Sequence, residues 1–265
     1  MEGDRRDFRT LVAIMDRLRG PNGCPWDLEQ TAHTLKKYMQ EEVYEALDAV
    51  DREDWDHLAE ELGDVLLEVV FLAKVCEQAG RFSIGDAVEQ VTNKLVRRHP
   101  HIFGDDEAKD AEDVFRRWHK LKMAERGSNM SGMLDKVPRN LPALLRAYRL
   151  SERVSKVGFD WENVGQVMEK YEEEWREFRA ALAGGDPARL EDELGDLLFT
   201  LVNVGRFLDL NAEDALRKAT EKFTRRFREV EREFEERGRP MDEAGIAALE
   251  EAWQRAKRTV DGKRE

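Results

Sequence analysis

Most of the chain carries hydrophobic and polar positions with the period of an α-helix. Phe8, Leu11, Val12, Met15 and Leu18 fall at the i, i+3, i+4 and i+7 spacing that gives a helix one apolar face. The same period predicts further helices at residues 31–51, 54–80, 84–98, 110–126, 142–156, 162–183, 187–209, 212–237 and 242–260. No segment alternates in the manner of a β-strand, so we predict an all-α fold.

The two halves of the chain repeat the same motifs in the same order. Two acidic blocks in the first half recur 132 positions later in the second half. The recurring blocks are Glu41-Glu42-x-x-Glu45 with Glu173-Glu174-x-x-Glu177, and Glu61-Leu62-Gly63-Asp64 with Glu193-Leu194-Gly195-Asp196. This pattern indicates an internal duplication. We therefore predict tandem helical-bundle domains at 1–126 and 142–265, joined by a polar, proline-containing linker at 127–141.

Composition narrows the class of protein. Hydrophobic residues make up 41% of the chain, enough for a core, and charged residues 38%, which suits helices with charged outer faces. The net charge of −13 argues against nucleic-acid binding, because neutralising phosphates requires a cationic surface. No apolar stretch is as long as a membrane span, and the first residues lack the apolar core of a signal peptide. We expect a soluble, cytoplasmic protein without a membrane partner.

Paired carboxylates in the second half form a candidate metal site. Glu174 and Glu177 project from one face of their helix, and so do Glu193 and Asp196. The short turn at 184–187 predicts an antiparallel hairpin in which the two pairs converge. Four converging carboxylates repel one another unless a cation lies between them. Because all the donors are oxygens, the pattern favours Mg²⁺, with Mn²⁺ as a possible substitute.

The first half holds a second candidate metal site at the matching positions. Its members are Glu42, Glu45, Glu61 and Asp64. One acidic pair on a highly charged chain is more often a solvated helix face. The repetition of both pairs at one offset, beside apolar residues, favours metal binding over that alternative.

Cationic and aromatic residues of the second half suit a ligand with several phosphates and a base. The candidate substrate-binding residues are Arg189, Lys222, Arg225, Arg226, Trp253 and Lys257. Cations beside a metal bind phosphates, and an indole can stack on a base. The alternatives are a solvated basic face and, for Trp253, a position in the core. Arg189 corresponds to His57, whose imidazole is mostly neutral at pH 7, so we predict the main active site in the second half.

Together these motifs resemble the two-domain form of the MazG family of all-α nucleoside triphosphate pyrophosphohydrolases. Besides the acidic blocks, the resemblance lies in GPNGCPWD (20–27), RRHPHIFG (97–104), VGFDW (157–161), GDLLFTLVNVGRFL (195–208) and EKFTRRFREVE (221–231). It implies Mg²⁺-dependent hydrolysis of ribo- and deoxyribonucleoside triphosphates to a monophosphate and pyrophosphate. It also implies a homodimer.

The resemblance extends to individual residues. Glu174, Glu177, Glu193 and Asp196 match the family's metal-binding carboxylates, and Arg189, Lys222, Arg226, Trp253 and Lys257 match positions that line its nucleotide site. We expect a water activated by the metal to attack the α-phosphorus. One of Glu173, Glu174 or Glu177 would accept its proton, which completes a catalytic set with Glu193 and Asp196.

Two other functions stay open from the sequence. One is a narrower pyrophosphatase for dUTP or dCTP, and the other is a non-catalytic regulatory protein that binds a nucleotide or a metal. The first-half site could be catalytic, regulatory or structural.

Overall fold

Every regular element in the part of the chain that the computed structural model describes, residues 4–124 and 132–262, is a helix. This confirms the predicted all-α class. The chain divides into two compact units, Met1–Asn129 and Met130–Glu265. The start of the predicted linker, 127–131, and the end of the predicted helix at 110–126 lie outside the described residues. The domain boundaries given above remain predictions.

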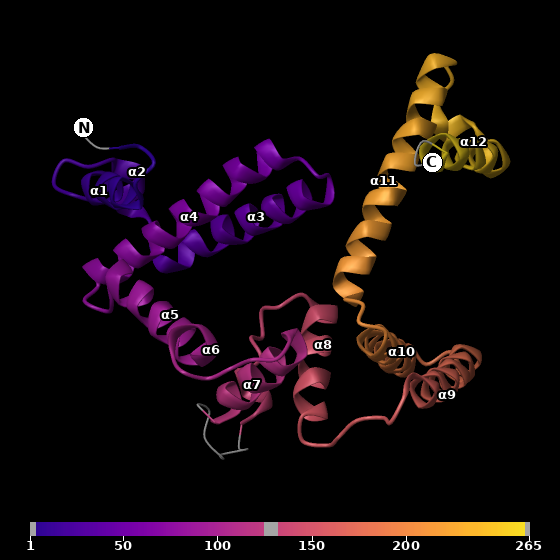
Figure 1. Cartoon of the computed structure of the whole chain (residues 1–265). Coiled ribbons are helices and arrows are strands. Elements are labelled where there is room, and N and C mark those ends of the chain that lie inside the picture. The colour runs from indigo at the N-terminus through magenta and orange to yellow at the C-terminus, as the bar shows by residue number, and fades with distance from the viewer. Residues whose placement is uncertain (1–3, 125–131, 263–265) are drawn as a thin grey trace. The chain divides into compact units, whose positions relative to one another are not determined.

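The first unit is built on a long helical hairpin of α3 and α4 (Figure 1). Its helices are α1 (Phe8–Leu18), α2 (Pro25–Glu29), α3 (Ala32–Asp51), α4 (Trp55–Gln78), α5 (Ile84–Arg98), α6 (Pro100–Phe103) and α7 (Ala111–Ala124). α1 packs against α4, and the buried core between the helices consists of Met15, Leu35, Val70 and Phe71. Burial of these side chains fixes the hairpin on which the first acidic blocks lie.

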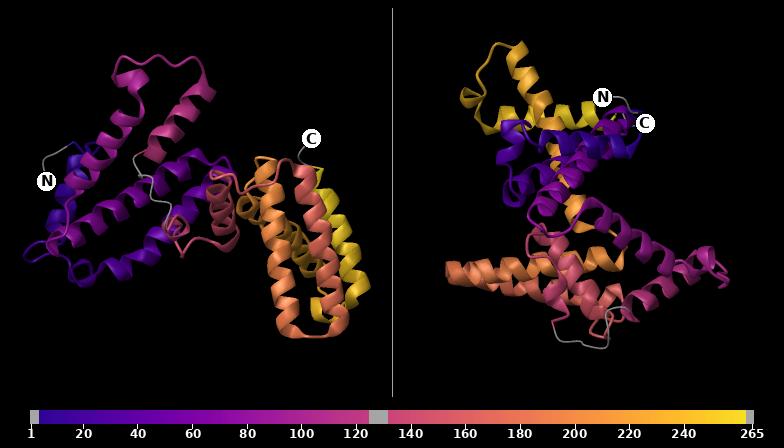
Figure 2. Two further views of the ribbon diagram at one scale, coloured as in Figure 1. Left: turned by 90° about the horizontal axis from the view of Figure 1, so that it is seen from below. Right: turned by 90° about the vertical axis from the view of Figure 1, so that its left-hand side faces the viewer.

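The second unit repeats this plan with the hairpin of α9 and α10. Its elements are η1 (Leu134–Lys136), α8 (Ala143–Ser155), α9 (Val164–Gly184), α10 (Pro187–Phe207), α11 (Ala212–Glu236), η2 (Met241–Glu243) and α12 (Gly245–Asp261). α8 packs against α10 and α11, and α12 packs against α11. A core of Val230, Phe234, Ala244, Ala252 and Ala256 joins α11 and α12. Figure 2 shows the helices of each hairpin side by side.

The turn between α9 and α10 forms as its sequence predicts. Gly185 ends α9 in the left-handed region at φ 70°, which a residue without a side chain adopts at little cost. Asp186 then caps α10 by accepting a hydrogen bond from the backbone of Ala188, and Pro187 occupies the first helical position. The reversal brings the acidic blocks of the two helices face to face.

The long helices begin and end within three residues of the predicted ranges wherever both ends are described. Two short helices, α2 and α6, were not predicted from the sequence. Pro25 and Pro100 begin them, because proline fits the first helical turn, where its missing N–H would have no intrahelical partner. None of the helices in the described ranges is long and apolar enough to cross a membrane.

Candidate functional site

The α9–α10 hairpin brings the acidic residues of the second unit together. Carboxylate oxygens of Glu174, Glu177 and Glu193 all lie within 4.8 Å of one another. Asp196 follows Glu193 by three residues on the same face of α10, and burial, followed by the charges of Glu174, Asp192 and Glu193, raises the pKa of its carboxyl. Glu174 is buried, with a side chain that is 7% exposed. The convergence inferred from spacing is therefore present, and its chemical role as a metal site remains a prediction.

A lysine that the sequence analysis did not select lies against this cluster. Lys170 Nζ is 2.7 Å from Glu174 Oε1 and 2.8 Å from Glu173 Oε1. The hydrogen bond from Lys170 lowers the pKa of Glu173, and both carboxylates raise the pKa of Lys170. Lys170 is one turn before Glu174 on α9, so the i, i+4 spacing was a signal that could have identified it.

Arg189 lies beside the same cluster, on the α10 side. Its Nε is 3.5 Å from Glu193 Oε1, and its side chain is 58% exposed. A surface hollow with a volume of about 560 Å³ runs along α10 here, lined by Arg189, Asp192, Gly195 and Asp196 among others. Gly195 has nothing within 4 Å of the place where a Cβ would be, so the backbone is open to a ligand at this point.

The first unit has the matching cluster on α3 and α4. Carboxylate oxygens of Glu42, Glu45 and Glu61 lie within 4.8 Å of one another. Burial, followed by the charges of Asp64, Glu45, Glu61 and Glu41, raises the pKa of Glu42. His57 Nε2 is 3.0 Å from Glu61 Oε1, where the second unit has Arg189.

Glu68 adds a further acidic residue to the first-unit cluster. It follows Asp64 by four residues and Glu61 by seven, which places all three on one face of α4. Glu68 is only 8% exposed, and burial together with the charges of Glu42 and Asp64 raises its pKa. The sequence analysis missed Glu68 because its counterpart in the second half is Thr200, so the duplication gave no matching block.

The remaining predicted substrate-binding residues lie on α11 and α12. They are Lys222, Arg225 and Arg226 on α11, and Trp253 and Lys257 on α12. The Arg226 guanidinium is 5.9 Å from the Trp253 ring centroid, and Arg226 also forms an ion pair with Asp261. Trp253 packs against the core between the two helices, with its ring 5.1 Å from that of Phe223. This hairpin therefore forms one mixed cationic and aromatic surface.

The structure does not bring this surface to the carboxylates of the same chain. α11 begins at the end of α10, contacting α8 and α10, and α12 folds back on α11 (Figure 1). α11 extends away from the α9–α10 hairpin (Figure 1), and Lys222 is ten residues into α11, about 15 Å along its axis. Glu193 and Asp196 are more than ten residues before the end of α10. Helical spacing predicted which residues share a face, but it could not predict which helices pack together.

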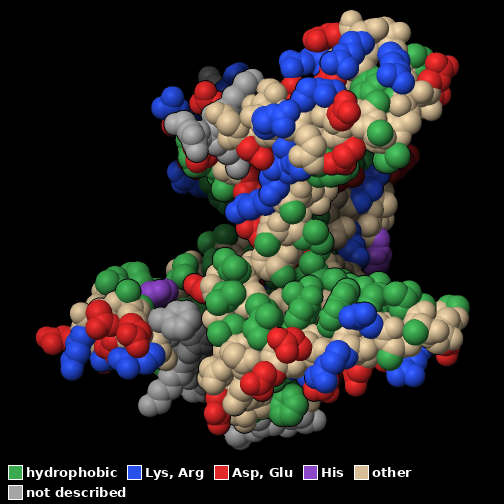
Figure 3. All heavy atoms as spheres, turned by 90° about the vertical axis from the view of Figure 1, so that its right-hand side faces the viewer, with side chains coloured by type: hydrophobic (Ala, Val, Ile, Leu, Met, Phe, Trp, Pro, Cys, Tyr) green, Lys and Arg blue, Asp and Glu red, His purple; other side chains and the backbone are tan. Residues whose placement is uncertain are grey.

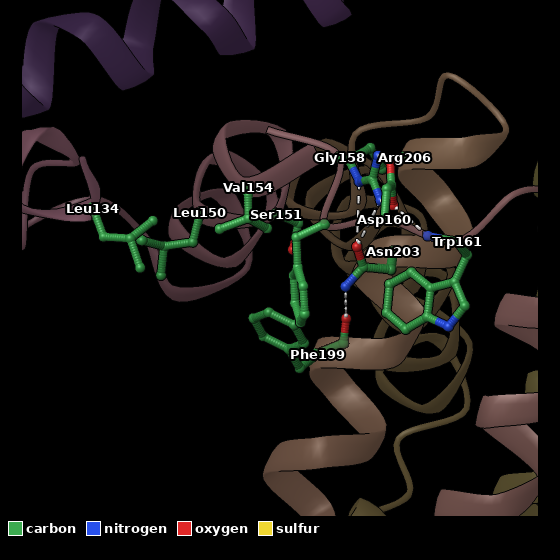
Figure 4. A pocket seen from close by; sticks show the side chains of 11 residues that line it. Leu134, Leu150, Ser151, Val154, Gly158, Asp160, Trp161, Phe199, Asn203 and Arg206 are labelled. Atoms are coloured by element: carbon green, nitrogen blue, oxygen red, sulfur yellow. Dashed lines mark hydrogen bonds and ion pairs between the residues drawn. The ribbon is translucent and has the colours of Figure 1, made fainter. Parts of the chain in front are cut away.

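A second hollow in this unit lies between α8, α10 and the loop that carries the VGFDW motif (Figure 4). Its volume is about 520 Å³, and apolar side chains such as Phe199 and Trp161 line most of it. Arg206 Nη1 donates a 2.9 Å hydrogen bond to Asp160, and Asn203 Nδ2 donates one of 3.0 Å to the Phe199 carbonyl. The Arg206–Asp160 interaction fastens the loop to α10, whereas the Asn203 bond lies within α10 itself.

Comparison with known proteins places both hairpins in one kind of domain. Residues 30–103 and 159–231 match the MazG nucleotide pyrophosphohydrolase domain. The chain is 49% identical over 252 residues to a nucleoside triphosphate pyrophosphohydrolase of Escherichia coli (strain K12), covering 94% of this chain and 96% of that protein. It is 44% identical over 250 residues to the nucleoside triphosphate pyrophosphohydrolase/pyrophosphatase MazG of Thermotoga maritima, covering 94% and 95% respectively. The domain occurs twice, which confirms the predicted duplication.

Proposed function

The chain belongs to the MazG nucleotide pyrophosphohydrolase family, and from this premise we propose that it hydrolyses ribo- and deoxyribonucleoside triphosphates to a monophosphate and pyrophosphate with Mg²⁺. Its general activity is that of a nucleoside triphosphate pyrophosphohydrolase, a hydrolase acting on phosphoric anhydride bonds. The observation that carries the finer proposal is the group of carboxylate oxygens from Glu174, Glu177 and Glu193 within 4.8 Å of one another.

The donor set fits a hard divalent cation. Every candidate ligand among Glu174, Glu177, Glu193 and Asp196 offers carboxylate oxygens, which Mg²⁺ and Mn²⁺ prefer. Carboxylates this close together repel one another, and a cation removes that repulsion. When bound, Mg²⁺ supplies positive charge to the phosphates and makes water more acidic at the α-phosphorus.

The chain's own residues supply proton transfer and charge. Glu173, Glu174 and Glu177 are candidates to accept the proton of the attacking water. Of the two glutamates that Lys170 contacts, Glu173 is the more exposed. Arg189 has an exposed side chain next to the hollow, so its guanidinium can turn from Glu193 to a substrate phosphate. Lys170 is a second cation at the same place.

A second copy of the chain would complete this site. Leu194, Leu198 and Leu201 form an exposed apolar stripe on α10 at i, i+4 and i+7, and the same positions of α4 carry Leu62, Leu66 and Val69. Figure 3 shows hydrophobic side chains gathered in a band over the part of the second unit where α9 and α10 lie. Pairing two such faces buries apolar surface in a homodimer.

That pairing offers a place for the distant surface on α11 and α12. We assign Lys222, Arg225, Arg226 and Lys257 to the phosphates of a nucleotide held by the partner's carboxylates, and Trp253 to its base. The Trp253 ring has one face near Arg226, so stacking on a base would extend a cation–π arrangement.

Product analysis tests the proposal. The protein is incubated with each ribo- and deoxyribonucleoside triphosphate, with and without Mg²⁺, and the products are separated by chromatography. We expect a monophosphate and pyrophosphate only with metal, at comparable rates for several bases. Turnover restricted to dUTP or dCTP would support the narrow enzyme. Diphosphate with orthophosphate, or no product at all, would contradict the proposal.

Matched variants locate the site. Glu193→Gln is expected to lower turnover by roughly a hundredfold or more, because it removes a charged candidate ligand, while the helical content stays unchanged. Glu172→Gln, an exposed change on the side of α9 away from Glu174, is the control and should retain activity. Glu61→Gln should reduce turnover less than Glu193→Gln. The reverse order would place the main site in the first unit.

A further inference from the structure

The two carboxylate clusters differ at two matching positions. Glu68 of the first unit corresponds to Thr200, and Tyr38 corresponds to Lys170. The first cluster therefore gains a carboxylate, whereas the second gains an ammonium group that contacts two of its glutamates. Arg189 in place of His57 adds another full cation to the second cluster.

Two buried oxygens indicate that the first cluster is built for a ligand. Glu61 Oε2 and Glu68 Oε2 are buried and have no hydrogen-bond partner among the described residues. The side chain of Glu61 is 6% exposed, and Glu68 is 8% exposed. A buried acceptor without a donor costs free energy, and a buried carboxylate costs more. Carboxylate oxygens alone can coordinate a hard divalent cation, so such a cation would give both buried oxygens a partner.

The balance of charge differs accordingly. The first cluster has five acidic side chains, Glu42, Glu45, Glu61, Asp64 and Glu68. Among the described residues, His57 is the one basic side chain that pairs with them. The four carboxylates of the second unit share their surroundings with Lys170 and Arg189. The first cluster attracts a bare cation strongly, while the cations of the second compete with a metal and attract phosphates.

We propose that the first unit holds a resident divalent cation, with Glu68 as an additional carboxylate ligand, and that it binds this cation without a nucleotide. The second unit takes up the metal together with the nucleotide, because the phosphates draw Lys170 and Arg189 away from the glutamates. The first unit therefore binds a metal ion without substrate, whereas the site in the second unit is adapted to an anionic substrate. This difference in metal binding between the two units goes beyond the proposed hydrolysis, since it concerns metal binding in the absence of substrate.

A titration of the full-length protein with Mn²⁺ tests this difference in metal binding between the two units. Free Mn²⁺ is followed by its electron paramagnetic resonance signal, first without nucleotide and then with a non-hydrolysable triphosphate analogue. Without nucleotide, Glu193→Gln should leave Mn²⁺ binding as in the wild type, and Glu61→Gln should remove most of it. With the analogue, additional Mn²⁺ should bind in the wild type but not in Glu193→Gln.

A second set of variants tests the residues that distinguish the units. Glu68→Gln should weaken nucleotide-independent Mn²⁺ binding about tenfold or more, since it removes a buried charge from the ligand set. The control Glu60→Gln removes an exposed charge from the same helix and should have little effect. Lys170→Gln should allow the second unit to bind Mn²⁺ without nucleotide. Circular dichroism establishes that each variant is folded.

Three results would overturn the proposal. These are loss of nucleotide-independent binding in Glu193→Gln, unchanged binding in Glu68→Gln, and no Mn²⁺ binding by the wild type without nucleotide. Because these measurements contain no turnover step, each of them could fail while the hydrolysis of nucleotides stands. If Mn²⁺ binds as expected but no pyrophosphate is released, the proposed hydrolysis is contradicted and the proposal on metal binding stands.

Discussion

Asn203 illustrates how one buried polar side chain links the VGFDW loop to α10 in the second unit. It is fully buried on α10, two turns beyond Asp196. Its amide donates to the Phe199 carbonyl, and its Oδ1 accepts hydrogen bonds of 3.2 Å from Arg206 Nε and Nη2. Arg206 in turn binds Asp160 in the VGFDW loop. The side chain thus links the loop to the helix through a charged neighbour.

Replacing this amide should destabilise the second unit. We expect Asn203→Ala to lower the free energy of unfolding by about 1–3 kcal/mol, because Arg206 loses an acceptor and a cavity forms. Ser151→Ala is the matched control, since this buried hydroxyl lines the same hollow and has no partner among the described residues. Urea denaturation followed by circular dichroism measures both. Equal midpoints for the two variants would contradict the role given to Asn203.

At the residue scale, the sequence predicts which acidic residues come together where their motif is repeated. Spacing on one helix face and recurrence at a fixed offset were sufficient to select the acidic blocks that the hairpins bring together. Glu68 and Lys170 were missed because each occurs in one half only. The i, i+4 spacing of Lys170 and Glu174 was a signal for Lys170, but the burial of Glu68 could not be read from spacing.

Among the helices, the α11–α12 hairpin has an ion pair at its centre. Arg255 Nε and Nη2 on α12 donate hydrogen bonds of 3.0 and 2.6 Å to Glu233 on α11. The hydrogen bond from Arg255 lowers the pKa of Glu233 from its ordinary value of 4.5. The pair therefore contributes stability above that value, and the contribution is lost as the pH falls through the lower folded-state pKa.

Glu233→Gln should accordingly be less stable than the wild type only when Glu233 is ionised. We expect a thermal midpoint about 1–3 °C lower at pH 7, and no difference once the pH is below the folded-state pKa of Glu233, where the wild-type carboxyl is protonated. Thermal unfolding followed by circular dichroism at several pH values checks this, with the exposed Glu235→Gln as control. A midpoint difference independent of pH would mean that packing, not charge, is lost.

Element positions were more predictable than element contacts. Apolar periodicity, together with Gly185, Asp186 and Pro187 at the turn, located α9 and α10 and their antiparallel arrangement. The spacing of Lys222 and Arg226 was equally regular, yet their helix packs on α12 and α8 rather than beside α9. Apolar faces on amphipathic helices are similar to one another, so their sequence does not specify the partner.

For the whole molecule, the repeated apolar stripes on α4 and α10 are exposed in a single chain, and the proposed dimer would bury them. We expect the double variant Leu66→Glu and Leu198→Glu to prevent the proposed dimer from forming, because charges would be buried in each paired face. Sedimentation velocity measures the state, and turnover should fall with it. Ile246→Glu, a change at an exposed apolar residue outside the stripes, should remain dimeric. A wild-type protein that is monomeric and fully active would contradict the proposal that a second chain completes the nucleotide site.

The hairpin construction also has a consequence for the order in which the protein can fold. The helices that carry each acidic cluster are neighbours in sequence, joined by a turn of a few residues, so their contacts close small loops and form rapidly. Synthesis proceeds from the N-terminus, and units fold as they emerge. The first cluster is therefore complete as soon as α4 has left the ribosome, before any residue of the second cluster has been made.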